Sequence, residues 1–202
     1  MDRPNYLKEL KKIILAAKGG TVFVSTDFLD IADKKTVDVG LARLCNEGLI
    51  RRLFRGVYEK PERNDFLGEY VAPFPDKVAL ALARNYNWTI IPCGDTALNL
   101  LGLSTQVPAT WLYISDGPYK NYRFDGIILR FKKTANKEIS KMSYKTALIV
   151  QAIKALGKNG VDEKVIFRLQ TILTYEEKVT LLREAKTVTS WVYESIKQIC
   201  RG

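Results

Sequence analysis

The side chains that could do chemistry in this 202-residue sequence are mainly cations, and many of them lie between residues 34 and 55. Histidine is absent, which excludes triads, general bases and metal sites built on imidazole. The three cysteines (45, 93 and 200) are widely spaced and form no CxxC pair, so neither a disulfide framework nor a thiolate zinc site is expected. We therefore expect no catalytic residue, no metal and no cofactor, and the net charge of +10 favours a polyanionic partner.

The elements that position these cations follow from hydrophobic periodicity. The pattern predicts a first helix, a short strand over 21–24, a short second helix over 25–32, a third helix over 36–46 and a hairpin over 49–58. This is the element order of a winged helix-turn-helix, and we predict that residues 1–62 form such a domain and bind double-stranded DNA. A module that docks on a protein is the alternative, supported by acidic neighbours such as Asp33, Asp38 and Glu47.

The predicted DNA contacts come from the third helix and the hairpin. They are Lys34, Lys35, Thr36, Val39, Arg43, Arg51, Arg52 and Arg55. Small residues on the third helix allow a close approach to the major groove, and Arg55 lies at the hairpin tip beside a glycine. Strand alternation places Arg51 and Arg52 on opposite faces, so the three arginines cannot all point the same way. Six phosphate contacts would give a log–log salt slope of roughly −5.

The rest of the chain predicts a second domain after a polar, proline-containing linker over 61–75. Residues 70–202 show a helix over 76–86, strands over 88–91, 111–115 and 127–131, and helical periodicity from about 143 onward. The predicted fold class is therefore α+β: an N-terminal winged helix-turn-helix, then an α+β domain with a helical C-terminal tail. No apolar run is long enough to span a bilayer and no secretory signal is evident, so we expect no membrane partner and a cytoplasmic location.

A second basic segment lies within residues 118–145, where aromatic side chains are interleaved with cations. Its candidate nucleic-acid contacts are Lys120, Arg123, Arg130, Lys132 and Lys133. Basic and aromatic side chains together suit RNA or single-strand binding by charge and stacking. The same composition suits a half-buried hairpin with aromatic core residues and solvated lysines, and both interpretations stay open.

Three segments resemble the abortive-infection AbiEi antitoxin family of type IV toxin–antitoxin pairs. They are LARLCNEGLIRRLFRGVYEKP (41–61), IIPCGDTALNLLGLSTQVPATWLYISDG (90–117) and IILRFKK (127–133). The resemblance covers about residues 1–135, and residues 143–202 lie outside it. It implies a winged helix that represses its own promoter, and a C-terminal domain that counters a nucleotidyltransferase-like toxin without a tight complex. It also implies that six residues occupy positions of the family's helix and wing: Lys35, Thr36, Arg43, Arg51, Arg52 and Arg55.

These observations predict a non-enzymatic, DNA-binding transcriptional repressor that is also an antitoxin. The rival is a metal-dependent nuclease or nucleic-acid-processing enzyme targeted by the winged helix. Asp116 and Asp125 flank a strand pair and would be its carboxylates. Each aspartate is followed by glycine, a pair of residues that is typical of tight turns, and this favours the non-enzymatic interpretation.

Overall fold

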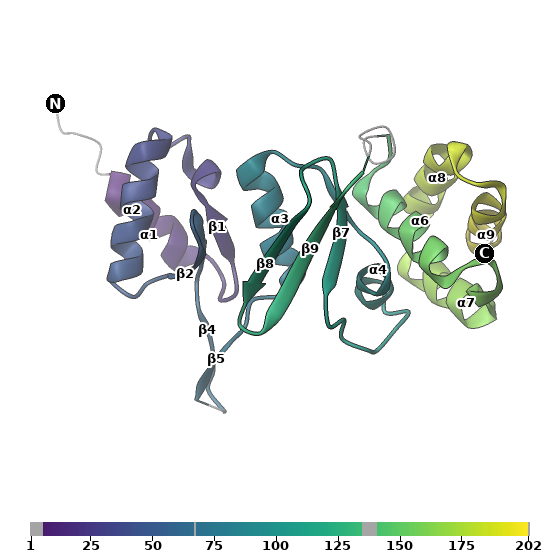
Figure 1. Cartoon of the computed structure of the whole chain (residues 1–202), viewed down its shortest axis with the longest axis horizontal. Helices are drawn as coiled ribbons and strands as arrows, with labels where there is room; N and C mark the ends of the chain where they lie inside the picture. The colour runs from purple at the N-terminus through teal and green to yellow at the C-terminus, as the bar shows by residue number, and fades with distance from the viewer. Residues whose placement is uncertain (1–5, 67, 135–140, 202) are drawn as a thin grey trace. The chain divides into compact units, whose positions relative to one another are not determined.

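The computed structural model describes residues 6–66, 68–134 and 141–201, and the protein is α+β with a helical C-terminal region, as predicted (Figure 1). It divides into two compact units, Met1–Trp88 and Thr89–Gly202. The division falls later than the predicted boundary between residues 62 and 70. The helix that follows the predicted linker belongs to the first unit, because it packs on a strand of that unit.

The first unit begins with the predicted order of elements. The elements are α1 (Tyr6–Ala16), β1 (Val22–Val24), the 3-10 helix η1 (Ser25–Phe28), α2 (Lys34–Asn46), β2 (Arg51–Phe54) and β3 (Val57–Glu59). The strands form an antiparallel sheet in the order β1-β3-β2. The core of this part is built by the buried stripes of α1 and α2 with Phe28 of η1, and Leu10, Ile14 and Leu41 are fully enclosed.

Helix α3 (Pro75–Tyr86) completes the first unit by packing on β1. Arg84 ties it there, because its guanidinium donates to both oxygens of Asp27 at 2.8 and 3.1 Å and to the carbonyl of Val22 at 3.3 Å. Pro75 occupies the first turn, where a missing N–H costs nothing, and Asn87 ends the helix in the left-handed conformation. Sequence periodicity found this helix but carried no sign of its partner strand.

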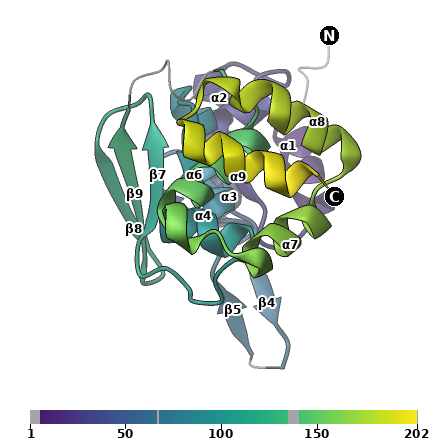
Figure 2. The same cartoon turned by 90° about the vertical axis from the view of Figure 1, so that its right-hand side faces the viewer.

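The predicted linker is an antiparallel hairpin made of β4 (Glu62–Asn64) and β5 (Glu69–Val71). Gly68 makes the turn with a φ of +70°, and its N–H donates to the carbonyl of Asn64 at 2.8 Å. The hairpin extends away from the rest of its unit in two views (Figures 1 and 2). Its aromatic side chains are therefore open to solvent: Phe66 is 95% exposed and Tyr70 is 67% exposed.

The second unit contains a four-stranded sheet in the order β6-β7-β9-β8. Its strands are β6 (Ile90–Pro92), β7 (Trp111–Ser115), β8 (Lys120–Phe124) and β9 (Ile127–Lys133). Strands β7 and β9 pair in parallel, and the other pairs are antiparallel. Strand β8 is an addition to the predicted strands, and it forms a tight hairpin with β9 through Asp125 and Gly126, both at positive φ.

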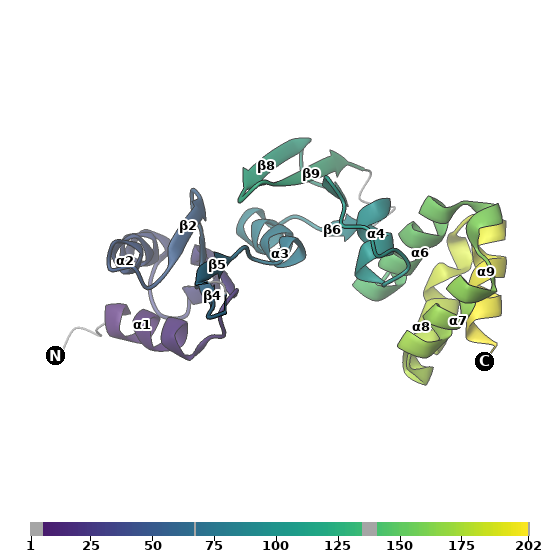
Figure 3. The same cartoon turned by 90° about the horizontal axis from the view of Figure 1, so that it is seen from below.

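The helices of the second unit are α4 and a C-terminal group. Their bounds are α4 (Asp95–Leu100), α6 (Tyr144–Leu156), η2 (Lys158–Gly160), α7 (Glu163–Ile172), α8 (Tyr175–Glu184), η3 (Ala185–Thr187) and α9 (Ser190–Cys200). Helix α6 lies between the sheet and α7–α9, and the group shares one core that includes Ile149, Leu169 and Ile196 (Figure 3). Among the described residues no helix is long and apolar enough to cross a membrane.

A long-range cap joins the two ends of this helical group. Glu184, at the end of α8, accepts hydrogen bonds from the backbone N–H and the hydroxyl of Ser143, each at 2.8 Å, at the N-terminus of α6. Burial by itself would raise the pKa of Glu184, but hydrogen bonds from Thr146 and Ser143 and the charge of Arg183 outweigh it and lower the pKa. The ionised carboxylate therefore stabilises this junction.

Gly40 sets how closely α1 and α2 approach. A Cβ at this position would lie 2.6 Å from the Cδ1 atom of Leu10, which is fully buried. We expect Gly40→Val to lower the free energy of unfolding by about 2 kcal/mol through overpacking. Ala42→Val, on the exposed face of the same helix, should cost only about 0.5 kcal/mol through helix propensity. Urea unfolding measures both, and equal losses would contradict the close α1–α2 contact.

The cap at Glu184 predicts a pH-dependent contribution to stability. Since the pKa is lowered in the folded protein, the contribution is complete above the unfolded value and is lost as pH falls through the folded value. Glu184→Gln should lower the urea midpoint at pH 7, and the difference from wild type should shrink below about pH 4.5. Glu194→Gln, an exposed ion-pair partner of Lys197, is the control and should have little effect at any pH. A difference that grows with acidity would refute the assignment.

Candidate functional site

The outward face of α2 is exposed along its whole length. Lys35, Val39, Ala42 and Asn46 recur at helical spacing and are exposed, with Val39 at 49%. Arg43, beside this stripe in the last turn, is also exposed. The inward residues Val37, Leu41 and Leu44 are fully buried, so the helix is fixed by one face and presents the other to solvent. Such a face, polar with small side chains, can enter a major groove.

The N-terminus of α2 is already capped. The carboxylate of Asp33 accepts from the backbone N–H groups of Lys35 and Thr36 at 3.0 and 3.1 Å, and from the Thr36 hydroxyl at 2.6 Å. These hydrogen bonds lower the pKa of Asp33, and the bond from the Thr36 hydroxyl has the largest effect. The hydroxyl of Thr36, a predicted DNA contact, is therefore engaged in the cap. A phosphate at this end of α2 would contact lysine side chains rather than free backbone N–H groups.

A cavity of about 480 Å³ lies between α2, the β2–β3 hairpin and the end of α3. Three cations and one carboxylate line it: Lys34 and Asp38 from α2, and Arg52 and Arg55 from the hairpin. Asp38 accepts a hydrogen bond from the Ser25 hydroxyl, and the cations outnumber it. Each of the three is exposed, and the guanidinium of Arg52 donates to the carbonyl of Phe54 at 3.2 Å. Three positive side chains around an open polar cavity form a site for an anionic group such as a phosphate.

The wall and floor of this cavity come from residues that the sequence did not single out. Tyr58 is 5% exposed, and its burial raises the pKa of its hydroxyl, which nearby Arg52 partly offsets. Asn85 and Tyr86 contribute the end of α3, and the Oδ1 atom of Asn85 is buried without a hydrogen-bond partner in the described structure. No sequence signal joins residues 85 and 86 to the hairpin, because only the packing of α3 on β1 brings them there.

Arg51 is a correction to the predicted set of DNA contacts. Its Nε atom donates at 2.5 Å to an oxygen of Glu59, whose side chain is completely buried on β3. The two residues are direct cross-strand partners, so the arginine turns towards the sheet while Arg52 faces outward. Arg51 therefore neutralises a buried carboxylate and is removed from the candidate DNA surface.

The basic segment of the second unit is divided between the two faces of its sheet. Arg123, Arg130 and Lys132 share one face and are all exposed, since Asn121 on the strand of Arg123 pairs with Arg130. Lys120 and Lys133 lie on the opposite face, which also carries Tyr122, Phe124 and Phe131.

The aromatic side chains of this segment are core residues. Phe131 is fully buried and stacks on Tyr113 with ring centroids 5.5 Å apart, and Tyr122 meets Phe131 edge-on at 5.9 Å. Arg123, Arg130 and Lys132 therefore lie on the face opposite these aromatic side chains, whereas the exposed Lys120 and Lys133 share the aromatic face. Nucleic-acid binding by this segment stays a prediction.

The carboxylates of the rival nuclease interpretation are far apart. Asp116 follows the end of β7, which lies beside Lys133 at the end of β9, whereas Asp125 precedes the start of β9 at Ile127. The length of β9, roughly 20 Å for six residue steps, separates them, and two carboxylates at that distance cannot hold one metal ion. Asp116 instead accepts from the N–H of Thr89 at 2.8 Å. Within the described residues no group of three or more acidic or cysteine side chains could hold a metal.

Comparisons with known proteins find a family model and a distantly similar solved structure. The model of a family described as "Family of unknown function (DUF6088)" matches residues 9–181. No curated protein matches the sequence. The crystal structure of the RV2827C protein from Mycobacterium tuberculosis aligns with 98% of this chain and 76% of its own, at 12% identity and a TM-score of 0.41.

The buried pair predicts different effects for the two neighbouring arginines. Arg51→Ala leaves the Glu59 carboxylate buried without its ion-pair partner and should lower the free energy of unfolding by about 2 kcal/mol, a value reduced for the partial exposure of the arginine. Arg52→Ala should change it by less than about 0.5 kcal/mol, because its guanidinium is at the surface. Chemical unfolding of both variants tests this, and the reverse order would show that Arg52 is the structural residue.

Proposed function

Because the chain belongs to the DUF6088 family, to which no function is assigned, we propose its function from its own geometry: the first unit is a winged helix-turn-helix that binds double-stranded DNA. The cation-lined cavity beside α2 is the observation that carries the proposal. In this arrangement α2 enters the major groove and the β2–β3 hairpin is the wing. The sugar–phosphate backbone then passes between them, where Lys34, Arg52 and Arg55 are placed to receive it.

The contacts have different roles in this proposal. Lys35, Val39 and Arg43 on the outward face of α2 approach base edges, and Val39 offers an apolar contact such as a thymine methyl group requires. Lys34, Arg52 and Arg55 hold phosphates and supply affinity without reading sequence. Five cations rather than six then contribute, because Arg51 is turned towards Glu59.

The biological role that fits such a unit is repression of its own promoter, in the cytoplasm. The resemblance of residues 1–135 to AbiEi antitoxins supports the further proposal that the protein neutralises a nucleotidyltransferase-like toxin encoded beside it. A neighbouring gene of that class would test this, provided that its expression is toxic and that co-expression of the present chain restores growth. A neighbour without toxicity would leave a repressor that has no antitoxin role.

The DNA-binding proposal predicts a steep and residue-specific salt dependence. Three phosphate contacts, by Lys34, Arg52 and Arg55, give a slope of about −2.7 in a plot of log affinity against log salt concentration. Replacing both Arg43 and Arg55 with alanine should reduce the magnitude of that slope by about 1, through the lost phosphate contact of Arg55, and abolish preference for the chain's own upstream DNA at about 150 mM salt. Fluorescence anisotropy with upstream and unrelated duplexes of equal length measures both quantities.

Lys12→Ala is the matched control, since it removes an exposed cation from α1, in the same unit but outside the proposed surface. It should leave the slope within about 0.5 of wild type, a size set by one weakly coupled charge. Binding that is unaffected by the double substitution, or that is equally weakened by the control, would exclude the assigned surface.

A further inference from the structure

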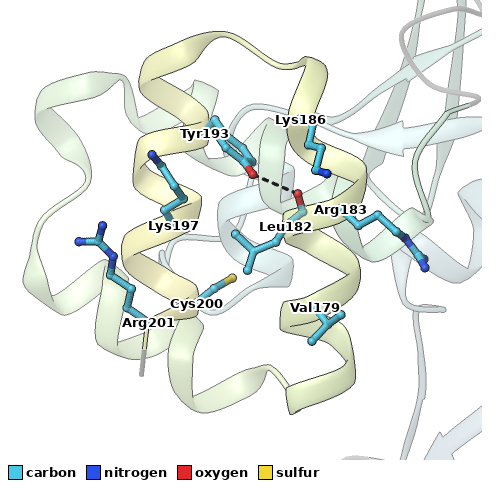
Figure 4. Close-up of a pocket in the computed structure, with 8 residues that line it drawn as sticks. All are labelled: Val179, Leu182, Arg183, Lys186, Tyr193, Lys197, Cys200 and Arg201. Carbon is cyan, nitrogen blue, oxygen red and sulfur yellow. Dashed lines mark hydrogen bonds between the residues drawn. The ribbon is translucent and has the colours of Figure 1, made fainter.

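A groove between α8 and α9 has no role in the proposed function. It has a volume of about 460 Å³, and its floor is formed by Leu182, Tyr193 and Cys200 (Figure 4). The Tyr193 hydroxyl is directed to the carbonyl of Leu182 at 3.4 Å, and burial raises the pKa of the Cys200 thiol, so the floor is neutral. This volume lies in the range of small-molecule sites and has room for an aromatic ring.

The rim of the groove is strongly basic. Arg183 and Lys186 come from the α8 side, and Lys197 and Arg201 come from the α9 side (Figure 4). Lys197 forms an ion pair with Glu194 at 2.6 Å. The carboxylate of Glu184 lies 4.0 Å from Arg183 and accepts from Ser143, so it does little to neutralise this rim. An apolar floor between two rows of cations is complementary to an acidic segment that carries an exposed apolar side chain.

The chain itself contains such a segment, the hairpin over residues 62–71. Phe66, at its turn, is 95% exposed, which is extreme for a large aromatic side chain. Asp65 adjoins it, and Glu69 lies across the turn as the strand partner of Asn64, so two exposed carboxylates flank the ring. Three acidic residues against one arginine make the hairpin net negative.

We propose that the 62–71 hairpin of one copy docks in the α8–α9 groove of a second copy. Phe66 rests on the floor formed by Leu182, Tyr193 and Cys200, and Asp65 and Glu69 meet the cations of the rim. Both complementary surfaces are present on every chain, so self-association needs no other component. A single aromatic anchor in an apolar groove, surrounded by opposite charges, is the usual arrangement of an interface hot spot. A nucleic acid fits this groove less well, because the floor has a single aromatic ring, Tyr193, and Lys197 already lies over that ring at 5.6 Å.

Sedimentation velocity of the full chain over a range of concentrations tests the proposal. The average mass should rise with concentration, and Phe66→Ser should weaken association at least tenfold. Phe167→Ser is the matched control, because Phe167 is a 69% exposed phenylalanine on α7 that does not line the groove. A mass that stays at one chain overturns the proposal, as does an equal effect of the two substitutions; the first result would also follow if the hairpin docked within its own chain.

A charge-exchange experiment identifies the two surfaces. One variant carries Asp65→Lys and Glu69→Lys, and the other carries Arg183→Glu, Lys186→Glu and Arg201→Glu, which makes the rim net negative. Each alone should lose self-association by at least tenfold, because its hairpin and groove then have the same sign. Mixed together they should associate again, since each hairpin then faces a groove of opposite sign. Failure of the mixture to associate, with both variants retaining wild-type helical circular dichroism, overturns the proposal.

A thiol cross-link locates the contact directly. Asp65→Cys should form a disulfide-linked pair of chains with Cys200 under mild oxidation, and adding Cys200→Ser should abolish it. Cross-linking that persists without Cys200 would contradict the assigned contact.

The same charge variants separate this inference from the proposed DNA binding. Their affinity for a short single-site duplex should equal that of wild type, since none of the changed residues lies on the α2 face or the wing. If reversal of the groove charges weakens DNA binding and leaves the mass unchanged, the groove is a nucleic-acid surface and the docking proposal is overturned. If DNA binding is absent from wild type, the mass measurement still decides the docking proposal.

Discussion

The ion pair between Arg51 and Glu59 constrains the first unit more than any other single contact. Glu59 is fully buried at the end of β3, the central strand of the sheet, with Val22 on one side and Arg51 on the other. A buried carboxylate requires a partner, so Arg51 must share its face of the sheet, and strand alternation then places Arg52 on the opposite face with Tyr58. Arg52 and Tyr58 both line the cavity beside α2, so the ion pair helps to determine which arginine reaches that cavity.

Sequence periodicity predicted the elements of the first unit because each has a strong local signal. The stripe of Val37, Leu41 and Leu44 has helical spacing, and the hairpin has a glycine at its turn. What could not be predicted is tertiary. An arginine that pairs with a buried carboxylate has the same sequence appearance as one that faces solvent, and no local pattern links Asn85 to Gly56. The structure therefore pairs one of the predicted arginines, Arg51, with a buried carboxylate, while the DNA-binding surface and the winged-helix identity of the unit stay proposals.

The second unit shows the same division between local and non-local information. Helical periodicity predicted a helical region from about residue 143, and α6, α7, α8 and α9 lie there. Strand β8 of this unit and the 62–71 hairpin of the first unit were missed, since short strands rich in polar residues have little signal of their own. The mixture of cations and aromatics over 118–133 was ambiguous for a different reason: only the register of β8 on β9 decides which side chains share a face.

The hydrogen bonds between Ser143 and Glu184 also affect the order in which the chain folds during its synthesis. Glu184 lies 41 residues after Ser143, so α6 is synthesised well before the carboxylate that binds its N-terminus. At about 5–20 residues per second, a ribosome needs roughly 2–8 s to add that stretch. During this interval the newly made α6 has its local cap, the Ser143 hydroxyl, but neither the Glu184 carboxylate nor the α7–α9 side of its core. The first unit ends at Trp88, so its contacts do not depend on these later residues. The chain therefore matures in two stages, and the nascent helical tail is the stage that a chaperone or protease would meet.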